Sequence, residues 1–181
     1  MKVLGITGMP GSGKTQALKV FYKKGFSIVS MGDVIRDLAR EKGIKEDPES
    51  IGRIAIEIRK NEGEDAVAKR CVKKILGLKK NVVIEGIRSL HEIDCFKKYF
   101  DDFVIVSIHA SPKTRYERLK RRGRPDDPKN FKEFLERDKR ELNIGMGSVI
   151  AKADFMVVNE SSLEKLYEEI EKIARIYESE S

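Results

Sequence analysis

The strongest constraint on this chain is an eight-residue segment near its start that matches the pattern GxxxxGK[ST] in full. A short apolar run over residues 3–6 precedes the segment, and a helical pattern follows it. A strand, this loop and a helix in that order form a phosphate-binding P-loop. A glycine-rich turn that carries Gly-Lys-Thr by chance would not require these neighbours, so the sequence favours the P-loop. The predicted loop consists of Gly8, Met9, Pro10, Gly11, Ser12, Gly13, Lys14 and Thr15.

The residue types of this loop suit a nucleoside triphosphate. Glycines let the backbone curl tightly, so that its N–H groups point toward phosphate oxygens. The helix that follows adds the partial positive charge of its N-terminus. We expect Lys14 to reach the β- and γ-phosphates and the Thr15 hydroxyl to ligate Mg²⁺. ATP and Mg²⁺ are therefore the predicted cofactors.

Short apolar runs alternate with helical patterns along the rest of the chain. The runs are rich in Val, Ile and Phe and lack polar alternation, which is typical of strands covered on both faces. They lie at residues 2–7, 27–30, 82–84, 103–109 and 155–158. Helical patterns lie at residues 14–24, 33–42, 48–62, 64–76, 90–100, 112–122, 129–142 and 161–177. This alternation predicts an α/β fold with a mainly parallel sheet.

Two regions interrupt the alternation. Three helical patterns follow one another between residues 33 and 76 without a strand, which predicts a helical region at the edge of the sheet. Residues 121–128 contain one glycine and two prolines, which break a helix, so we expect a loop between helices there. No repeat or linker divides the chain, and 181 residues suit one domain with its own core.

Composition excludes several classes of protein. Hydrophobic residues make up 40% and charged residues 37%, which is typical of a folded chain with a charged surface. No apolar run approaches the length of a membrane span, and no signal-peptide pattern opens the sequence, so we expect a cytoplasmic protein without a membrane partner. Cys71 and Cys95 stand outside any metal-ligand spacing and are expected to be buried free thiols. The net charge of +7 suits polyphosphate ligands as well as nucleic acid.

Other features separate the classes of P-loop protein. The chain has no Asn-Lys-x-Asp stretch to read guanine, which disfavours a GTPase, and its length is that of a small-molecule kinase. Residues 30–36 (SMGDVIR), 85–88 (EGIR) and 118–124 (RLKRRGR) resemble the acceptor-binding helix, the Asp-Gly-Phe-Pro-Arg stretch and the basic lid of nucleoside monophosphate kinases. Residues 153–163 are similar to the C-terminal strand and helix of dephospho-CoA kinases.

Together these segments look most like an archaeal family of P-loop proteins described as adenylate-kinase-related or dephospho-CoA-kinase-like. The resemblance covers nearly the whole chain. It implies a three-layer fold of the nucleotide-kinase type, with a five-stranded parallel sheet of order 2-3-1-4-5 and helices on both faces. It also implies an acceptor-binding helical insertion at about residues 33–77 and a lid at about residues 115–142, which are the two regions that interrupt the alternation.

The resemblance places an acceptor site at the ends of the second and third strands. Arg36 and Arg88 would grip the acceptor's phosphate, since a guanidinium can bind two phosphate oxygens at once. Asp33 would be a general base if the acceptor is a hydroxyl; otherwise it could cap a helix beginning at Val34. Glu85, where adenylate kinases have Asp, could organise Mg²⁺ through water. The predicted acceptor-binding residues are Ser30, Asp33, Arg36, Glu85, Gly86 and Arg88.

The lid and the last strand complete the predicted donor site. Arg118, Arg122 and Arg124 would close on the transferring phosphoryl group and stabilise its charge; the alternative is a solvated basic helix face. Asn159 begins a segment that, by the same resemblance, would contact ATP near its adenine. Within that segment, Ser161 could instead cap the last helix, with Glu164 three residues on.

Three functions remain open from the sequence. The first is transfer of the γ-phosphoryl group of ATP to a nucleotide-like acceptor such as AMP. The second is a kinase for a hydroxyl acceptor such as dephospho-CoA. The third is a nucleotide-binding regulator or slow ATPase without efficient transfer. RNA binding ranks below these, because no aromatic stacking residues accompany the arginines. The sequence does not indicate an oligomeric state.

Overall fold

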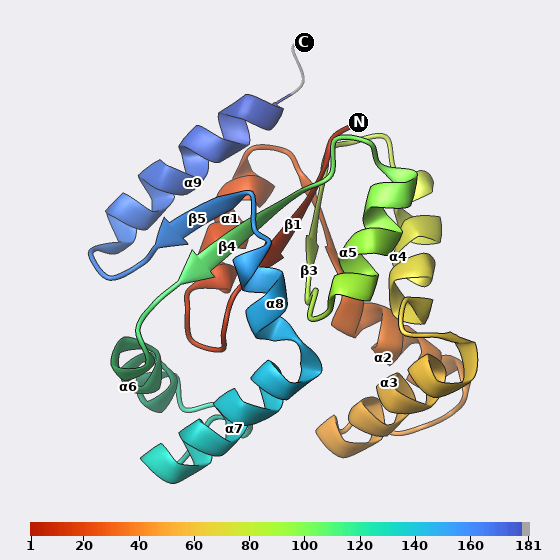
Figure 1. The fold of residues 1–181 in the computed structure, drawn as a ribbon, viewed down its shortest axis with the longest axis horizontal. Helices are drawn as coiled ribbons and strands as arrows, with labels where there is room; N and C mark the ends of the chain where they lie inside the picture. The colour runs from red at the N-terminus through yellow and green to blue at the C-terminus, as the bar shows by residue number, and fades with distance from the viewer. Residues whose placement is uncertain (179–181) are drawn as a thin grey trace.

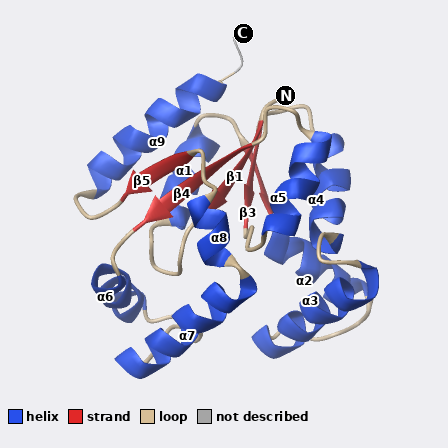
Figure 2. Cartoon of the chain, viewed as in Figure 1, coloured by secondary structure: helices blue, strands red, loops and turns tan. Residues whose placement is uncertain are grey.

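The computed structural model describes residues 1–178 and shows a three-layer α/β fold (Figures 1 and 2). Five parallel strands form one sheet in the order β2-β3-β1-β4-β5, which confirms the predicted topology. The strands are β1 (Val3–Thr7), β2 (Ser27–Ser30), β3 (Val82–Glu85), β4 (Val104–His109) and β5 (Phe155–Val158).

The register of the strands brings several predicted residues to one edge of the sheet. Ile6 of β1 pairs with Glu85 of β3, and Glu85 pairs in turn with Ser30 at the end of β2. Because all strands are parallel, the loops that follow β1, β2 and β3 leave the sheet on the same side. Ligands of open α/β sheets bind at this carboxyl edge.

Nine helices of the described chain flank the sheet. They are α1 (Lys14–Lys23), α2 (Met31–Glu41), α3 (Pro48–Glu62), α4 (Ala66–Leu76), α5 (Leu90–Tyr99), α6 (Pro112–Arg122), α7 (Phe131–Ile144), α8 (Met146–Ala151) and α9 (Leu163–Tyr177). In Figure 1 the α2–α3 pair and the α6–α7 pair lie at the end of the molecule toward which the strand arrows point. Parts of both irregular regions, α2–α3 and α6–α7, therefore lie at the carboxyl edge of the sheet, whereas α4 packs beside α5 against one face.

Alternate residues of the central strands supply two separate cores. Val82 and Ile84 of β3 pack with buried residues of α2, α4 and α5, whereas Val83 packs with α1 and α9 on the other face. Both faces of the central strands are thus covered, as predicted. Burial also raises the pKa of the Cys71 thiol to about 12, and both cysteines are buried and free, as expected.

The helix boundaries correct two sequence predictions. Helix α2 begins at Met31, and the Ser30 hydroxyl accepts a hydrogen bond from the Asp33 backbone N–H at 3.3 Å. The prediction that Asp33 caps a helix starting at Val34 is therefore wrong: Ser30 is the cap, and Asp33 lies in the first turn. The alternative cap at Ser161 is wrong for the same reason, because Ser162 accepts from the Lys165 N–H at 3.3 Å.

The predicted loop between two helices is present, and one helix was not predicted. Residues 123–130 connect α6 and α7, as the glycine and prolines indicated. Helix α8 was missed because its six residues are too few to show a helical period. Among the described residues, no helix combines the length and the apolar character needed to cross a membrane.

Strand β5 departs from the expectation that both faces are covered. Val157 is 6% exposed, and its side chain belongs to the core formed with α1 and α9. Its neighbours Met156 and Val158 point to the opposite face and are 50% and 61% exposed. The sheet therefore has an uncovered apolar strip at this edge.

Substitution of adjacent valines in β5 tests this one-sided burial. Val157→Thr places a hydroxyl in the core and should lower the free energy of unfolding by about 1–3 kcal/mol. Val158→Thr keeps the β-branched shape on an exposed face and should change it by less than about 0.5 kcal/mol. Urea unfolding of both variants measures the difference, and equal losses would contradict the assignment of faces.

Candidate functional site

The predicted P-loop connects β1 to α1, and its glycines are required by close contacts. Gly8 and Gly13 have φ angles of 143° and 111°, a region that other residues rarely adopt. A Cβ atom on Gly13 would overlap the side-chain nitrogen of Asn159, and one on Gly8 would overlap the carbonyl oxygen of Ile108. The loop is thus fitted tightly against β4 and the loop that follows β5.

Lys14 is folded back onto this loop. Its Nζ atom donates hydrogen bonds to the carbonyl oxygens of Gly8, at 2.5 Å, and Met9, at 3.2 Å. Burial lowers the pKa of Lys14 to about 8, while the carboxylate of Glu141 acts in the opposite direction. An anion placed beside Lys14 would stabilise its charged form, so the site is poised to bind one.

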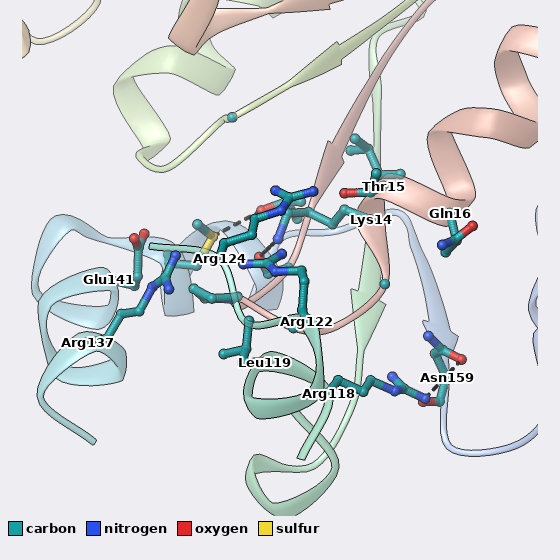
Figure 3. A pocket seen from close by; sticks show the side chains of 18 of the residues that line it. Lys14, Thr15, Gln16, Arg118, Leu119, Arg122, Arg124, Arg137, Glu141 and Asn159 are labelled. Atoms are coloured by element: carbon teal, nitrogen blue, oxygen red, sulfur yellow. Dashed lines mark hydrogen bonds between the residues drawn. The ribbon is translucent and has the colours of Figure 1, made fainter. Parts of the chain in front are cut away.

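A cavity of about 1030 Å³ opens over the loop (Figure 3). It brings together predicted residues from five parts of the chain: the P-loop, the loop after β3, helix α6, the loop between α6 and α7, and the loop after β5. Of the predicted residues, the cavity is lined by Gly8, Pro10, Gly11, Gly13, Lys14, Thr15, Gly86, Arg88, Arg118, Arg122, Arg124 and Asn159. Met9 and Ser12 belong to the same loop, but both are buried and do not line the cavity.

The other predicted acceptor residues do not line this cavity. Arg36 donates from Nε to the Asp33 Oδ1 at 3.0 Å, and both side chains are largely exposed on α2. Ser30 and Glu85 end their strands outside the cavity lining. The structure therefore places Arg88 in the same cavity as the P-loop, whereas Arg36 and Asp33 pair with each other outside the cavity lining.

Arg118 and Asn159 hold the edge of the P-loop. The Arg118 guanidinium donates to the Asn159 carbonyl oxygen at 2.9 Å, and the Asn159 side-chain amide donates to the Ser12 carbonyl oxygen at 2.8 Å. Figure 3 shows Arg118 of α6 reaching Asn159 at the side of the cavity. Three segments far apart in the sequence are joined at this point.

Arg115 is a residue whose role the sequence did not reveal. It is 3% exposed, and its guanidinium forms two hydrogen bonds to the Asp138 carboxylate, with Nη1–Oδ1 at 2.7 Å. It also donates to the carbonyl oxygens of Pro10 and Ala110, both at 3.2 Å, and lies over the Phe134 ring. Arg115 precedes the buried Leu119 by four residues, and this spacing was the signal that it faces inward.

Asp127 organises the lid loop between α6 and α7. Its carboxylate accepts from the Arg122 Nε at 2.8 Å, the Arg124 backbone N–H at 3.0 Å and the Arg137 Nη1 at 3.4 Å. The hydrogen bond from Arg122 holds the pKa of Asp127 at about 2. Arg122 thus lines the cavity with part of its charge already neutralised.

The charge of the cavity lining favours a polyanion. Lysines and arginines clearly outnumber acidic residues there, so several negative groups can be accommodated. The basic residues are Lys14, Lys19, Arg88, Arg118, Arg121, Arg122, Arg124 and Arg137; the acidic ones are Asp126 and Glu141.

The residues around the P-loop fit Mg²⁺ held mainly by a nucleotide. The exposed Thr15 residue lines the cavity next to Lys14, and its hydroxyl could serve as a protein ligand to Mg²⁺. The described residues contain no cluster of three or more His, Cys, Asp or Glu that could hold a metal by itself. Mg²⁺ commonly binds through one or two protein groups together with phosphates and water.

Comparisons with known proteins agree with this architecture. The profile of an AAA domain family, AAA_17, matches residues 7–134. A UPF0200 protein of Pyrococcus abyssi is 46% identical over 175 residues, which cover 94% of each chain. A UPF0200 protein of Methanocaldococcus jannaschii is 47% identical over 176 residues, covering 96% of this chain and 89% of that protein.

Solved structures share the fold at low sequence identity. TT1252 from Thermus thermophilus superposes with a TM-score of 0.61 at 16% identity and covers 97% of both chains. Shikimate kinase from Acinetobacter baumannii, in complex with shikimate, gives a TM-score of 0.59 at 14% identity, covering 98% of this chain and 93% of that one. These likenesses support a P-loop kinase fold.

The Arg115–Asp138 pair should be a major source of stability. Asp138→Asn would leave the buried guanidinium without its counter-charge and should lower the free energy of unfolding by about 3 kcal/mol or more. Asp126→Asn is the matched control, because Asp126 pairs with Arg137 while more than half exposed, and it should cost less than about 1 kcal/mol. Urea denaturation compares the two, and similar losses would contradict the argument.

Asp127 should make stability depend on pH in the acid range. Its pKa is about 2 in the folded chain against an ordinary value of 3.8, so the carboxylate stabilises the fold above about pH 5 and loses this effect as the pH falls toward 2. The full contribution is about 2 kcal/mol, of which about 1 kcal/mol should disappear between pH 5 and pH 3. The difference in free energy of unfolding between the native chain and Asp127→Asn, measured by urea unfolding, should therefore shrink by that amount. A difference that stays constant with pH would refute the assignment.

Proposed function

Because the chain belongs to the AAA_17 family of AAA domains and to the UPF0200 family, and has a P-loop kinase fold, we propose that it is an ATP-dependent phosphotransferase. It transfers the γ-phosphoryl group of ATP to a small nucleotide-like acceptor. Its products are ADP and the phosphorylated acceptor.

One observation carries this proposal: Lys14 and Thr15 of the P-loop line the same cavity as Arg88 and the arginines of α6 and the lid loop. A protein that binds ATP without transferring its phosphoryl group needs only a site for ATP. A second anion-binding group opposite the P-loop, with arginines around both, is what transfer between two anionic substrates requires. The surplus of positive charge in the cavity supports two bound anions.

The donor half consists of the P-loop and its neighbours. Lys14 would leave the carbonyls of Gly8 and Met9 to bind the β- and γ-phosphates, and the Thr15 hydroxyl would hold Mg²⁺, which neutralises phosphate charge. Arg118 and Asn159, which line the cavity beside the P-loop, would contact the nucleotide beyond its phosphates. Arg122, with Arg124, would stabilise charge on the transferring group.

The acceptor half is centred on Arg88 and Gly86. Arg88 would bind the acceptor's phosphate. Arg36, Asp33 and Ser30 complete this half only if α2 approaches the cavity when the acceptor binds, since they lie outside its lining in this structure. Glu85 remains a candidate for ordering Mg²⁺ through water, because its carboxylate is near enough to act on the pKa of Lys14.

A nucleoside monophosphate such as AMP is the acceptor we favour, and a hydroxyl compound such as dephospho-CoA is the alternative. The first acceptor needs no general base, which agrees with Asp33 being paired to Arg36 rather than free. The alternative to both is a nucleotide-binding regulator or slow ATPase.

An acceptor screen tests the proposal. The chain is incubated with ATP, Mg²⁺ and one of AMP, CMP, UMP, dephospho-CoA or a short RNA, and both ADP and the phosphorylated product are measured. A phosphotransferase releases ADP much faster with its acceptor than alone. ATP binding with no acceleration by any acceptor would favour the regulator.

Replacing the P-loop lysine should abolish turnover without unfolding the chain. Lys14→Ala removes the cation nearest the transferred phosphoryl group and should lower kcat by about 100-fold or more. Lys23→Ala removes an exposed lysine at the end of the same helix and should leave kcat unchanged. Steady-state ADP release measures both, with circular dichroism to confirm folding. Full turnover by Lys14→Ala would reject its proposed role.

A further inference from the structure

Glu141 is an inward-facing carboxylate of the lid region whose hydrogen-bonding capacity is only partly used. Asp138 is bound at both oxygens by Arg115, and Asp127 is bound by two arginines and a backbone N–H. Glu141, one turn beyond Asp138 on α7, has only Arg88 Nη1 at 3.4 Å from its Oε1. Its Oε2 is buried and has no hydrogen-bond partner among the described residues.

Oε2 is shielded by the surrounding protein and receives no hydrogen bond from a described residue. A carboxylate oxygen in such a place is stabilised by any donor that reaches it. The contact with Arg88 is also longer than the 2.7–2.9 Å of a strong charge-assisted hydrogen bond. A group that enters the cavity and donates a hydrogen bond to Oε2 would be such a donor.

The position of Glu141 makes such a group part of a substrate. Its side chain lines the cavity together with Lys14 and Arg88, and its charge acts on the pKa of Lys14. In Figure 3, Glu141 and Arg137 project from α7 across the cavity from Lys14 and Thr15. Glu141 thus lies beside the residue expected to bind the acceptor.

We propose that Glu141 is a specificity-determining residue for the acceptor, an inference that rests on the proposed phosphotransferase function. Its Oε2 accepts a hydrogen bond from a hydroxyl group of the acceptor, while Arg88, held by Oε1, binds the acceptor's phosphate. The acceptor is therefore a phosphate ester that also carries a hydroxyl group, such as a nucleoside monophosphate with its ribose hydroxyls.

Charge decides what Oε2 can accept. A carboxylate repels a phosphate oxygen, so the phosphate belongs to Arg88. A cationic amine is disfavoured because lysines and arginines dominate the cavity lining. A hydroxyl is neutral and donates a hydrogen bond, so it satisfies Oε2 without adding positive charge to the cavity.

Matched nucleotides with and without ribose hydroxyls test this inference. The probes are AMP, CMP and UMP and the 2′,3′-dideoxy form of each, titrated by calorimetry into the full chain saturated with Mg²⁺ and a non-hydrolysable ATP analogue. The proteins are the native chain, Glu141→Ala, Glu141→Gln and the control Glu136→Gln. Glu136 is an exposed residue of the same helix outside the cavity lining.

The native chain should bind at least one hydroxylated probe about 10- to 100-fold more tightly than its dideoxy form, as expected for a hydrogen bond to a charged group. Glu141→Ala should reduce this ratio to about 1, and Glu141→Gln should give an intermediate ratio. Glu136→Gln should keep the native ratio. All four proteins should bind the ATP analogue equally.

Four results would overturn the inference. The first is that the native chain shows no preference for the hydroxylated member of any probe pair, and the second is that such a preference survives in Glu141→Ala. The third is weaker binding of the ATP analogue by the Glu141 variants, which would assign the carboxylate to the donor half. The fourth is tighter binding of both members of a pair by Glu141→Ala, which would mean that Glu141 only competes for Arg88. Failure of the native chain to bind the ATP analogue would reject the proposed function itself.

Discussion

The buried ion pair between Arg115 and Asp138 is the interaction on which the site depends. Arg115 projects from α6. It contacts α7 through the Asp138 carboxylate and the Phe134 ring, and it donates a hydrogen bond to the Pro10 carbonyl oxygen of the P-loop. Gly11 must be glycine partly because its neighbour across this contact is the Arg115 backbone. Desolvating a guanidinium is costly unless its donors are paired, and here the pairing fixes the distance between the phosphate cradle and the helix that carries Glu141. A position off by an ångström would matter for phosphoryl transfer.

Electrostatics then distinguish the arginines of α6 and the lid. Arg115 is fully engaged and structural, whereas Arg122 lines the cavity with part of its charge neutralised by Asp127. Arg118 is bound to backbone and amide oxygens, which leave its positive charge uncompensated. The sequence presents all of them as one basic run. Their roles differ because Asp127 and Asp138, which come later in the chain, neutralise some members and not others.

The sequence predicted what is determined locally. The GxxxxGK[ST] pattern predicted the P-loop, and the apolar runs predicted an α/β fold with a mainly parallel sheet. The strand order 2-3-1-4-5 came from the family resemblance. The sequence misplaced the caps of α2 and α9 by one to three residues, because several neighbouring polar residues could each serve as the cap. It could not find Arg115–Asp138 or Arg88–Glu141, whose partners lie 23 and 53 residues apart. The grouping of Arg36 with Arg88 in one acceptor site stays a prediction, since Arg36 is outside the cavity lining and Arg88 is within it.

Arg88 connects the two regions that interrupt the strand–helix alternation. The fully buried Glu92 accepts hydrogen bonds from the backbone N–H groups of Arg88 and Ser89, at 2.8 and 3.2 Å, and from Arg59 of α3 at 2.9 Å. The side chain of Arg88 reaches Glu141 of α7. The lid therefore contacts the loop after β3 directly, and the helical region α2–α4 is joined to it through Glu92 of α5. In the proposed function, an acceptor bound by Arg88 and Glu141 would touch the lid directly and would be linked to α3 through the hydrogen bonds of Glu92.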